Sequence, residues 1–177
     1  MARFNREGAL LAGAAVVMLA AVAGGLVAGV ARPKIIVKKV DFVADFSDPR
    51  RVAGAAHNVF VGRVVRQGET VATPFVPRTM FAVQVLENIK GSLPGAVQVR
   101  QDGGFDADER ALVLVQNDPL LEVGRTYLFA TYHPPGADWH TPLAGYGDVP
   151  IRDERERAAL VSKFTAAVRA EIPVAPQ

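Results

Sequence analysis

The sequence contains no cysteine among its 177 residues. Disulfide bonds, zinc sites built on thiolates and thiol catalysis are therefore excluded, because each of them needs a sulfur atom that the chain lacks. The absence does not assign a compartment, since a cysteine-free chain is compatible with oxidising and reducing surroundings alike.

Histidine is also scarce, and the motifs of common enzyme classes are missing. The histidines are His57, His133 and His140. The sequence has no Gly-x-Ser-x-Gly motif, and none of its three serines has a histidine beside it. The tripeptide 90–92 (KGS) lacks the preceding glycine of a phosphate-binding loop. We therefore predict that the protein is not an enzyme and has no catalytic residue, cofactor or metal site.

Acidic residues are almost absent from the first forty positions, where Glu7 stands alone. Six of the twenty basic residues lie there, on both sides of a long apolar run. From Asp41 onward the chain has 14 basic and 17 acidic residues, so the folded part is mildly acidic although the pI of the whole chain is near 9.1. Such a domain lacks the basic surface that nucleic acid needs, and we predict no nucleic-acid partner.

The apolar run comprises residues 9–31, which are uncharged without interruption. A helix that spans a membrane needs about 20 apolar residues, so the run is long enough. It follows a short basic N-terminus, residues 1–8, which is typical of an export signal. A signal peptide cut after Ala23 stays open as an alternative. We favour an uncleaved signal anchor at 9–31 in the lipid bilayer, because the apolar run continues past that cleavage point.

The charges that flank this segment give conflicting indications of its orientation. The positive-inside rule counts lysines and arginines, and the C-terminal flank carries more of them. A first segment behind a short basic N-terminus usually acts as an export signal, however, and on that ground we predict a single-pass protein of the cell membrane with an extracytoplasmic C-terminal domain. Residues 32–46 are expected to form a solvated juxtamembrane linker, because the lysines around 35–37 lie on both faces of any strand there.

The stretch 79–85 has the strongest strand signal, because its apolar residues recur at every second position. These residues are Phe81, Val83 and Val85. Five further apolar segments predict strands at 59–66, 96–101, 111–115, 125–132 and 142–149. Gly62 interrupts the alternation in the first of these segments and predicts a bulge.

Two helices are predicted on either side of the strands. Ser47-Asp48-Pro49 is typical of a helix start, since a polar cap precedes a proline suited to the first turn. Asp153 and Glu156 have capping-box spacing, and the apolar residues that follow predict an amphipathic helix that ends near Ile172. The pattern predicts a mainly β domain over 47–172, a small OB-like β-barrel with a short N-terminal helix and a C-terminal amphipathic helix, followed by a tail at 173–177.

The order of these segments resembles the netrin-like module, the OB-type barrel of the tissue inhibitors of metalloproteinases. Residues 56–64 (AHNVFVGRV) resemble its first strand, residues 81–91 its second strand with a Lys-Gly end, and residues 121–129 (LEVGRTYLF) the start of its fourth. The sequence also resembles uncharacterised bacterial membrane-anchored envelope proteins. The resemblance implies an OB-like fold. It does not carry metalloproteinase inhibition over, because those inhibitors bind the catalytic zinc through an N-terminal cysteine, which this chain lacks.

Five residues from the last third of the domain are candidates for a partner-binding patch, since aromatic residues often anchor protein interfaces. They are Tyr132, His133, Trp139, His140 and Tyr146. The alternative is that they cover the mouth of the barrel. His133, Asp138 and His140 suit a divalent metal by residue type, but their spacing matches no standard site, and an ordinary polar loop is favoured. The acidic stretch 102–110 is likewise expected to be a solvated turn rather than a calcium loop.

The sequence therefore predicts a membrane-anchored binding or interaction module at the cell envelope, with an envelope protein as a candidate partner. The alternative is a protease inhibitor that acts through a barrel edge or a loop. A hydrolase with a site at His133 and His140 is a third hypothesis. The sequence identifies neither the ligand nor the oligomeric state.

Overall fold

The computed structural model describes residues 34–39, 45–116 and 118–174. The predicted N-terminus (1–8) and spanning segment (9–31) lie outside these residues. Within the described part, no helix is both long enough and apolar enough to cross a membrane. The chain divides into two units, residues 1–31 and 32–177, and every described element belongs to the second.

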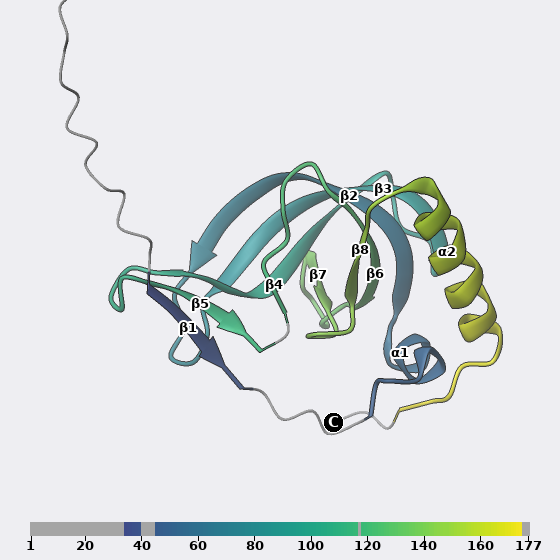
Figure 1. Ribbon diagram of the computed structural model, residues 1–177, viewed down its shortest axis with the longest axis horizontal. Helices are drawn as coiled ribbons and strands as arrows, with labels where there is room; N and C mark the ends of the chain where they lie inside the picture. Colours follow the sequence, from purple (N-terminus) through teal and green to yellow (C-terminus); the bar gives the residue numbers. More distant parts are fainter. Residues whose placement is uncertain (1–33, 40–44, 117, 175–177) are drawn as a thin grey trace, which may run out of the picture. The chain divides into compact units, whose positions relative to one another are not determined.

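The described residues are mainly β, with eight strands and two helices (Figure 1). The strands are β1 (Lys34–Lys38), β2 (Asn58–Val71), β3 (Arg78–Lys90), β4 (Ala96–Asp106), β5 (Ala111–Val115), β6 (Thr126–Tyr132), β7 (Trp139–Pro142) and β8 (Asp148–Ile151). The helices are α1 (Pro49–Ala55) and α2 (Glu154–Arg169). The predicted fold class, mainly β with a C-terminal helix, is confirmed at this level.

The strands form one strongly curved sheet in the order β1-β5-β4-β3-β2-β6-β7, and β8 pairs with β6. The curvature brings β4 beside β7, where Gln98 lies opposite Trp139 in a parallel pairing. The predicted bulge at Gly62 is confirmed by a register shift between Val61 and Gly62. A side chain does not fit at this position, because a Cβ atom would lie 2.6 Å from Cγ1 of Val83. The glycine therefore lets β2 bend tightly over β3.

The core consists of two clusters on opposite faces of β2 and β6. The inner cluster is built around Phe60 and Phe129, whose rings stack at 5.1 Å between centroids. The outer cluster places Leu128 and Ala130 beneath the helices, against Val52 and Phe164. Because β6 is buried on both faces, its central residues 127–130 are a continuous apolar run rather than an alternating one.

Both predicted helix starts are confirmed by their caps. Asp48 accepts a hydrogen bond from the backbone N–H of Arg50 at 2.9 Å, with Pro49 in the first turn. Asp153 Oδ1 accepts from the N–H of Glu156 at 2.8 Å. In a capping box the Glu156 carboxylate would accept from the backbone N–H of Asp153. Here it accepts from the N–H of Arg152, one residue before the cap, so the predicted capping box forms with this one change. The second helix ends at Arg169 and is three residues shorter than expected.

Part of the expected linker 32–46 forms a strand, and the prediction was wrong there. Strand β1 pairs in parallel with β5, with Ile35 opposite Leu112 and Val37 opposite Leu114. The prediction rejected a strand here because no face of it could be fully buried. However, β1 is the end strand of the described sheet, and four of its five residues are exposed. Lysines are tolerated at such an edge because their ammonium groups reach water.

The predicted strand ends also need correction. Strand β2 continues through 67–71, beyond its predicted end at residue 66. Strand β4 continues through 102–106, which was expected to belong to a solvated turn. The solvated turn of the acidic stretch is confined to 107–110. The strand expected at 142–149 is mostly a turn, which connects the end of β7 to the start of β8. His140 was expected in a loop but lies in β7.

Candidate functional site

The three histidines of the chain come together near the start of β7. The backbone N–H of His133 donates to Nδ1 of His57 at 3.0 Å. The rings of His133 and His140 lie 4.7 Å apart between centroids. Nδ1 of His133 is 3.1 Å from the carbonyl oxygen of Trp139. This histidine cluster (His57, His133, His140) includes a residue that the sequence analysis did not place in the patch.

The five residues of the predicted patch do not form a single exposed surface. Tyr132 is exposed, Trp139 is half-buried, and His140 is buried. Tyr146 lies in the turn between β7 and β8, where its ring is 5.8 Å from that of Phe46. The strand pairing of β7 buries His140 against the sheet, which an exposed loop would not do.

Several polar atoms around the histidine cluster are buried without a hydrogen-bond partner among the described residues. They are Nδ1 of His140, Nε1 of Trp139, Oγ1 of Thr141 and Nε of Arg100. The Arg100 guanidinium lies over the Trp139 ring, 4.4 Å from its centroid, in a cation–π contact. Burial, together with the nearby His133 and His57, lowers the pKa of His140, which favours the neutral imidazole. In the described residues no group of three or more side chains is arranged to hold a metal ion.

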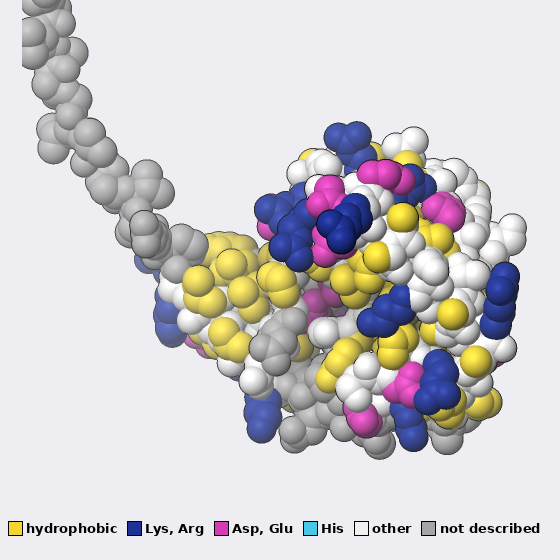
Figure 2. Space-filling model, turned by 45° about the vertical axis from the view of Figure 1, so that its right-hand side comes forward, with side chains coloured by type: hydrophobic (Ala, Val, Ile, Leu, Met, Phe, Trp, Pro, Cys, Tyr) yellow, Lys and Arg dark blue, Asp and Glu magenta, His cyan; other side chains and the backbone are white. Residues whose placement is uncertain are grey.

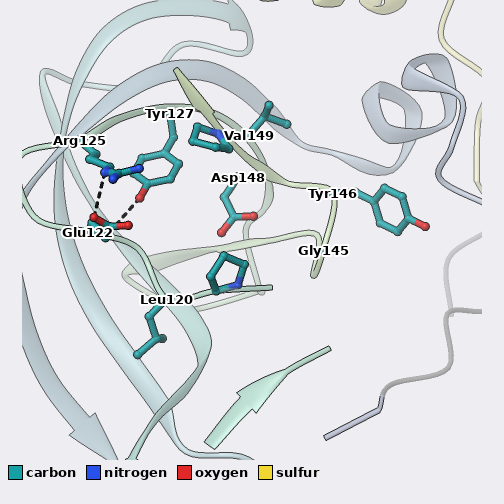
Figure 3. Close-up of a pocket in the computed structure, with 10 residues that line it drawn as sticks. Leu120, Glu122, Arg125, Tyr127, Gly145, Tyr146, Asp148 and Val149 are labelled. Carbon is teal, nitrogen blue, oxygen red and sulfur yellow. Dashed lines mark hydrogen bonds and ion pairs between the residues drawn. The ribbon is translucent and has the colours of Figure 1, made fainter. Parts of the chain in front are cut away.

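A pocket of about 230 Å³ lies beside a second polar cluster, which the sequence analysis did not predict. The pocket opens between the segment before β6 and the turn before β8 (Figure 3). Its walls are largely apolar, with Pro119, Leu120 and Val149 among them. The polar groups that line it include Asp148 and Tyr127, and Figure 3 shows the carboxyl group of Asp148 between Tyr127 and Gly145.

Gln101, on β4, organises this second cluster. It is 1% exposed, and its Oε1 accepts from the backbone N–H of Leu121 at 2.9 Å. This bond fixes the amide, so that Nε2 faces Asp118 and Asp148. Nε2 donates to Asp118 Oδ1 at 3.0 Å, to Asp148 Oδ2 at 2.9 Å and to the carbonyl oxygen of Pro119 at 3.0 Å. One neutral amide thus joins two acidic side chains from distant parts of the chain.

Both acids of this carboxyl cluster (Gln101, Asp118, Asp148) have raised pKa values. Burial raises the pKa of Asp148 well above its ordinary value, and the neighbouring Asp118 raises it further. Burial also raises the pKa of Asp118, although the hydrogen bond from Gln101 opposes the shift. Ionisation of both carboxyl groups is unfavourable in this partly buried site, so the pair binds its last proton more tightly than isolated carboxyl groups do.

An ion pair and a phenol lie at the rim of the pocket. Arg125 Nε lies 2.9 Å from Glu122 Oε2, and the N–H of Glu122 donates to the hydroxyl of Tyr127 at 3.0 Å. Burial raises the pKa of Tyr127, so the phenol keeps its proton and can donate it to a bound group. The described lining therefore offers a carboxyl acceptor and a phenol donor between apolar walls.

One feature of the sequence indicates this carboxyl cluster. Gln101 follows Val97 and Val99 at two-residue spacing, so the alternation of β4 places a polar amide at a core position. A buried glutamine needs partners for both ends of its amide. The partners themselves carried no local sign, since Asp118 is 17 residues and Asp148 is 47 residues away along the chain.

Comparison with known proteins adds no assignment. No protein-family model matches the chain, and a search of the curated proteins finds no match.

Proposed function

We propose that the protein is a membrane-anchored, extracytoplasmic binding module, and that the pocket beside Asp148 is its ligand site. The pocket is the observation that carries the proposal. It is a concave site with mostly apolar walls and a few polar groups that converge on it, the composition typical of small-molecule sites. The proposal includes no catalytic activity.

The charges in and beside the pocket favour a ligand with a protonated amine or with hydroxyl donors. Glu122 is already paired with Arg125, whereas Asp118 and Asp148 have no cationic partner among the contacts of their cluster. A ligand ammonium group would supply the counter-charge that the ionised carboxyl pair lacks, and would compete with protonation of the pair. Because the ligand and the proton compete, affinity is expected to rise with pH.

The anchor in this proposal is the apolar run 9–31, which has the length of a membrane span. The basic N-terminus before it supports export of the domain that follows. We also propose that the curved sheet is an OB-like, netrin-like barrel. Its support is the pairing of β4 with β7 across the sheet, together with the Gly62 bulge in β2.

The ligand site is tested by thermal unfolding of the full chain in detergent, with putrescine and glucosamine as probes. A ligand that binds the native state raises the melting temperature. We expect at least one probe to stabilise the parent chain and the control Asp138→Asn, whose acid is exposed outside the pocket, but not Asp148→Asn. Equal shifts in all three chains, or no shift in the parent, would contradict the pocket as a site for amines.

Protease inhibition is the second candidate function. One observation favours it: Phe75, in the loop 72–77 between β2 and β3, is 84% exposed and projects a large apolar side chain. An inhibitor needs such an anchor for the pocket of a protease. The full chain in detergent should then slow a serine or metalloprotease of the envelope, and Phe75→Ser should abolish the effect.

A further inference from the structure

The outer face of the ribbon formed by β1, β5 and the end of β4 exposes large apolar side chains. Ile35 lies opposite Leu112, and Leu112 lies opposite Phe105, so the three form one row across three strands. Ile35 is 60% exposed, Val37 58% and Phe105 54%. Figure 2 shows hydrophobic side chains gathered at the left of the molecule, the side on which Figure 1 draws β1 and β5.

The opposite face of the same ribbon is already covered. The buried residues of β5 are Ala111, Val113 and Val115, which alternate with the outward-facing Leu112 and Leu114. The ribbon is therefore apolar on both faces, although only the face with Ala111, Val113 and Val115 packs against the rest of the domain. A contiguous exposed apolar face of this kind is typical of an interaction surface. We call it the β1 face, defined by Ile35, Val37 and Phe105 with Leu112 and Leu114.

The position of β1 in the chain indicates what lies against this face. Lys34, its first residue, is the third residue after Ala31, the last residue of the apolar run. Three residues of extended chain reach about 10 Å. If the run spans a membrane, β1 lies within reach of the headgroup layer. Resting on the proposed anchor, we propose that the β1 face docks on the surface of the same bilayer.

The charges beside the β1 face predict how it docks. Lys34, Lys38 and Lys39 lie on or next to β1. The end of β4 and the turn after it carry three acids and one base: Asp106, Asp108, Glu109 and Arg110. The four basic residues exceed the three acids by one, so docking is mainly hydrophobic and depends only weakly on salt or on anionic lipid. The outer edge of β1 pairs with no described strand, so it stays in the hydrated headgroup layer while side chains dip below it.

The missing cysteines make the test specific, because one introduced cysteine is the only thiol in the chain. The full chain is reconstituted into phosphatidylcholine vesicles with an environment-sensitive fluorophore at Ile35→Cys or Phe105→Cys. Leu86→Cys and Val123→Cys are the matched controls, since both positions are exposed and apolar but lie outside the β1 face. A nitroxide quencher on the lipid chains reports contact with the bilayer, and flotation reports membrane insertion of each sample.

Docking predicts blue-shifted emission at positions 35 and 105 that loses most of its intensity to the lipid quencher, with neither effect at 86 and 123. Chains that float with the vesicles but show the same weak quenching at all four positions would overturn the docking and leave the anchor intact. A blue shift at 35 and 105 without quenching would mean that a protein or a second copy covers the face, and would also overturn it. Chains that do not float would contradict the proposed anchor itself.

Discussion

The histidine cluster and the carboxyl cluster both gather polar side chains in a mostly apolar domain, but they differ in how their atoms are satisfied. At the histidine cluster, Nδ1 of His140 and Nε1 of the adjacent Trp139 are buried without a partner among the described residues. At the carboxyl cluster, one amide bonds to two carboxyl groups and to a backbone N–H.

The two clusters also differ in whether their residues are close in the sequence or are brought together only by the fold. His133 and His140 stand out because they are close in the chain, whereas Asp118 and Asp148 meet only when β8 pairs beside β6 and Gln101 extends between them. The second cluster adjoins a pocket and has the strongly perturbed pKa values, which are typical of functional sites. We therefore expect the carboxyl cluster to respond strongly to substitution and the histidine cluster weakly.

The largest effect is expected for Gln101→Ala. The change leaves the N–H of Leu121 and two carboxyl groups without their partner, and breaking a buried network of this kind costs about 3 kcal/mol of the free energy of unfolding. Denaturation of the full chain in detergent, followed by the fluorescence of Trp139, measures it. The exposed Gln84→Ala on β3 is the control. Similar stability of the two variants would refute the central place of Gln101.

Asp148→Asn should stabilise the protein at neutral pH by about 1 kcal/mol, because an amide mimics the protonated carboxyl group. The raised pKa of Asp148 means that the folded state binds more protons than the unfolded state above the ordinary Asp value of 3.8. The stability of the parent therefore falls as pH rises through that interval, and the variant lacks this fall. Melting temperatures from pH 4 to 8 should diverge with rising pH. Parallel curves would show that the pair holds no extra proton.

His140 should produce a smaller dependence of the opposite sign. Its lowered pKa means that the unfolded state binds more protons below about 6.5, so stability falls as pH falls through that region. Asp148→Asn is used as the background, since it removes the opposing contribution. Adding His140→Gln, which cannot be protonated, should flatten the remaining slope between pH 8 and 5. An unchanged slope would assign it to other groups.

The smallest effect is expected for Arg100→Gln, which removes the cation–π contact with Trp139 and should cost about 0.5–1 kcal/mol. Arg100→Lys keeps the charge and should retain part of this contribution. Both are measured by the same denaturation. If Arg100→Gln destabilised as much as Gln101→Ala, the contrast between the two clusters would fail.

Local patterns predicted most of the fold, and they failed where the environment was decided by distant residues. The alternation at 79–85 and the caps at Asp48 and Asp153 are local, and the structure confirms all three. Strand β1 was missed because its partner β5 lies more than seventy residues away, and an end strand does not need a buried face. In the site, the amide of Gln101 was readable as a polar residue in a core position, but its acidic partners were not.

Protease digestion of intact cells that express the chain tests the proposed function most directly, with the mass of the polypeptide determined before and after. We predict that the region 41–177 is removed from whole cells and that a fragment with the uncut N-terminal segment stays with the membrane. Protection of the domain until the cells are broken would place it inside, and would contradict an exported binding module tethered by residues 9–31.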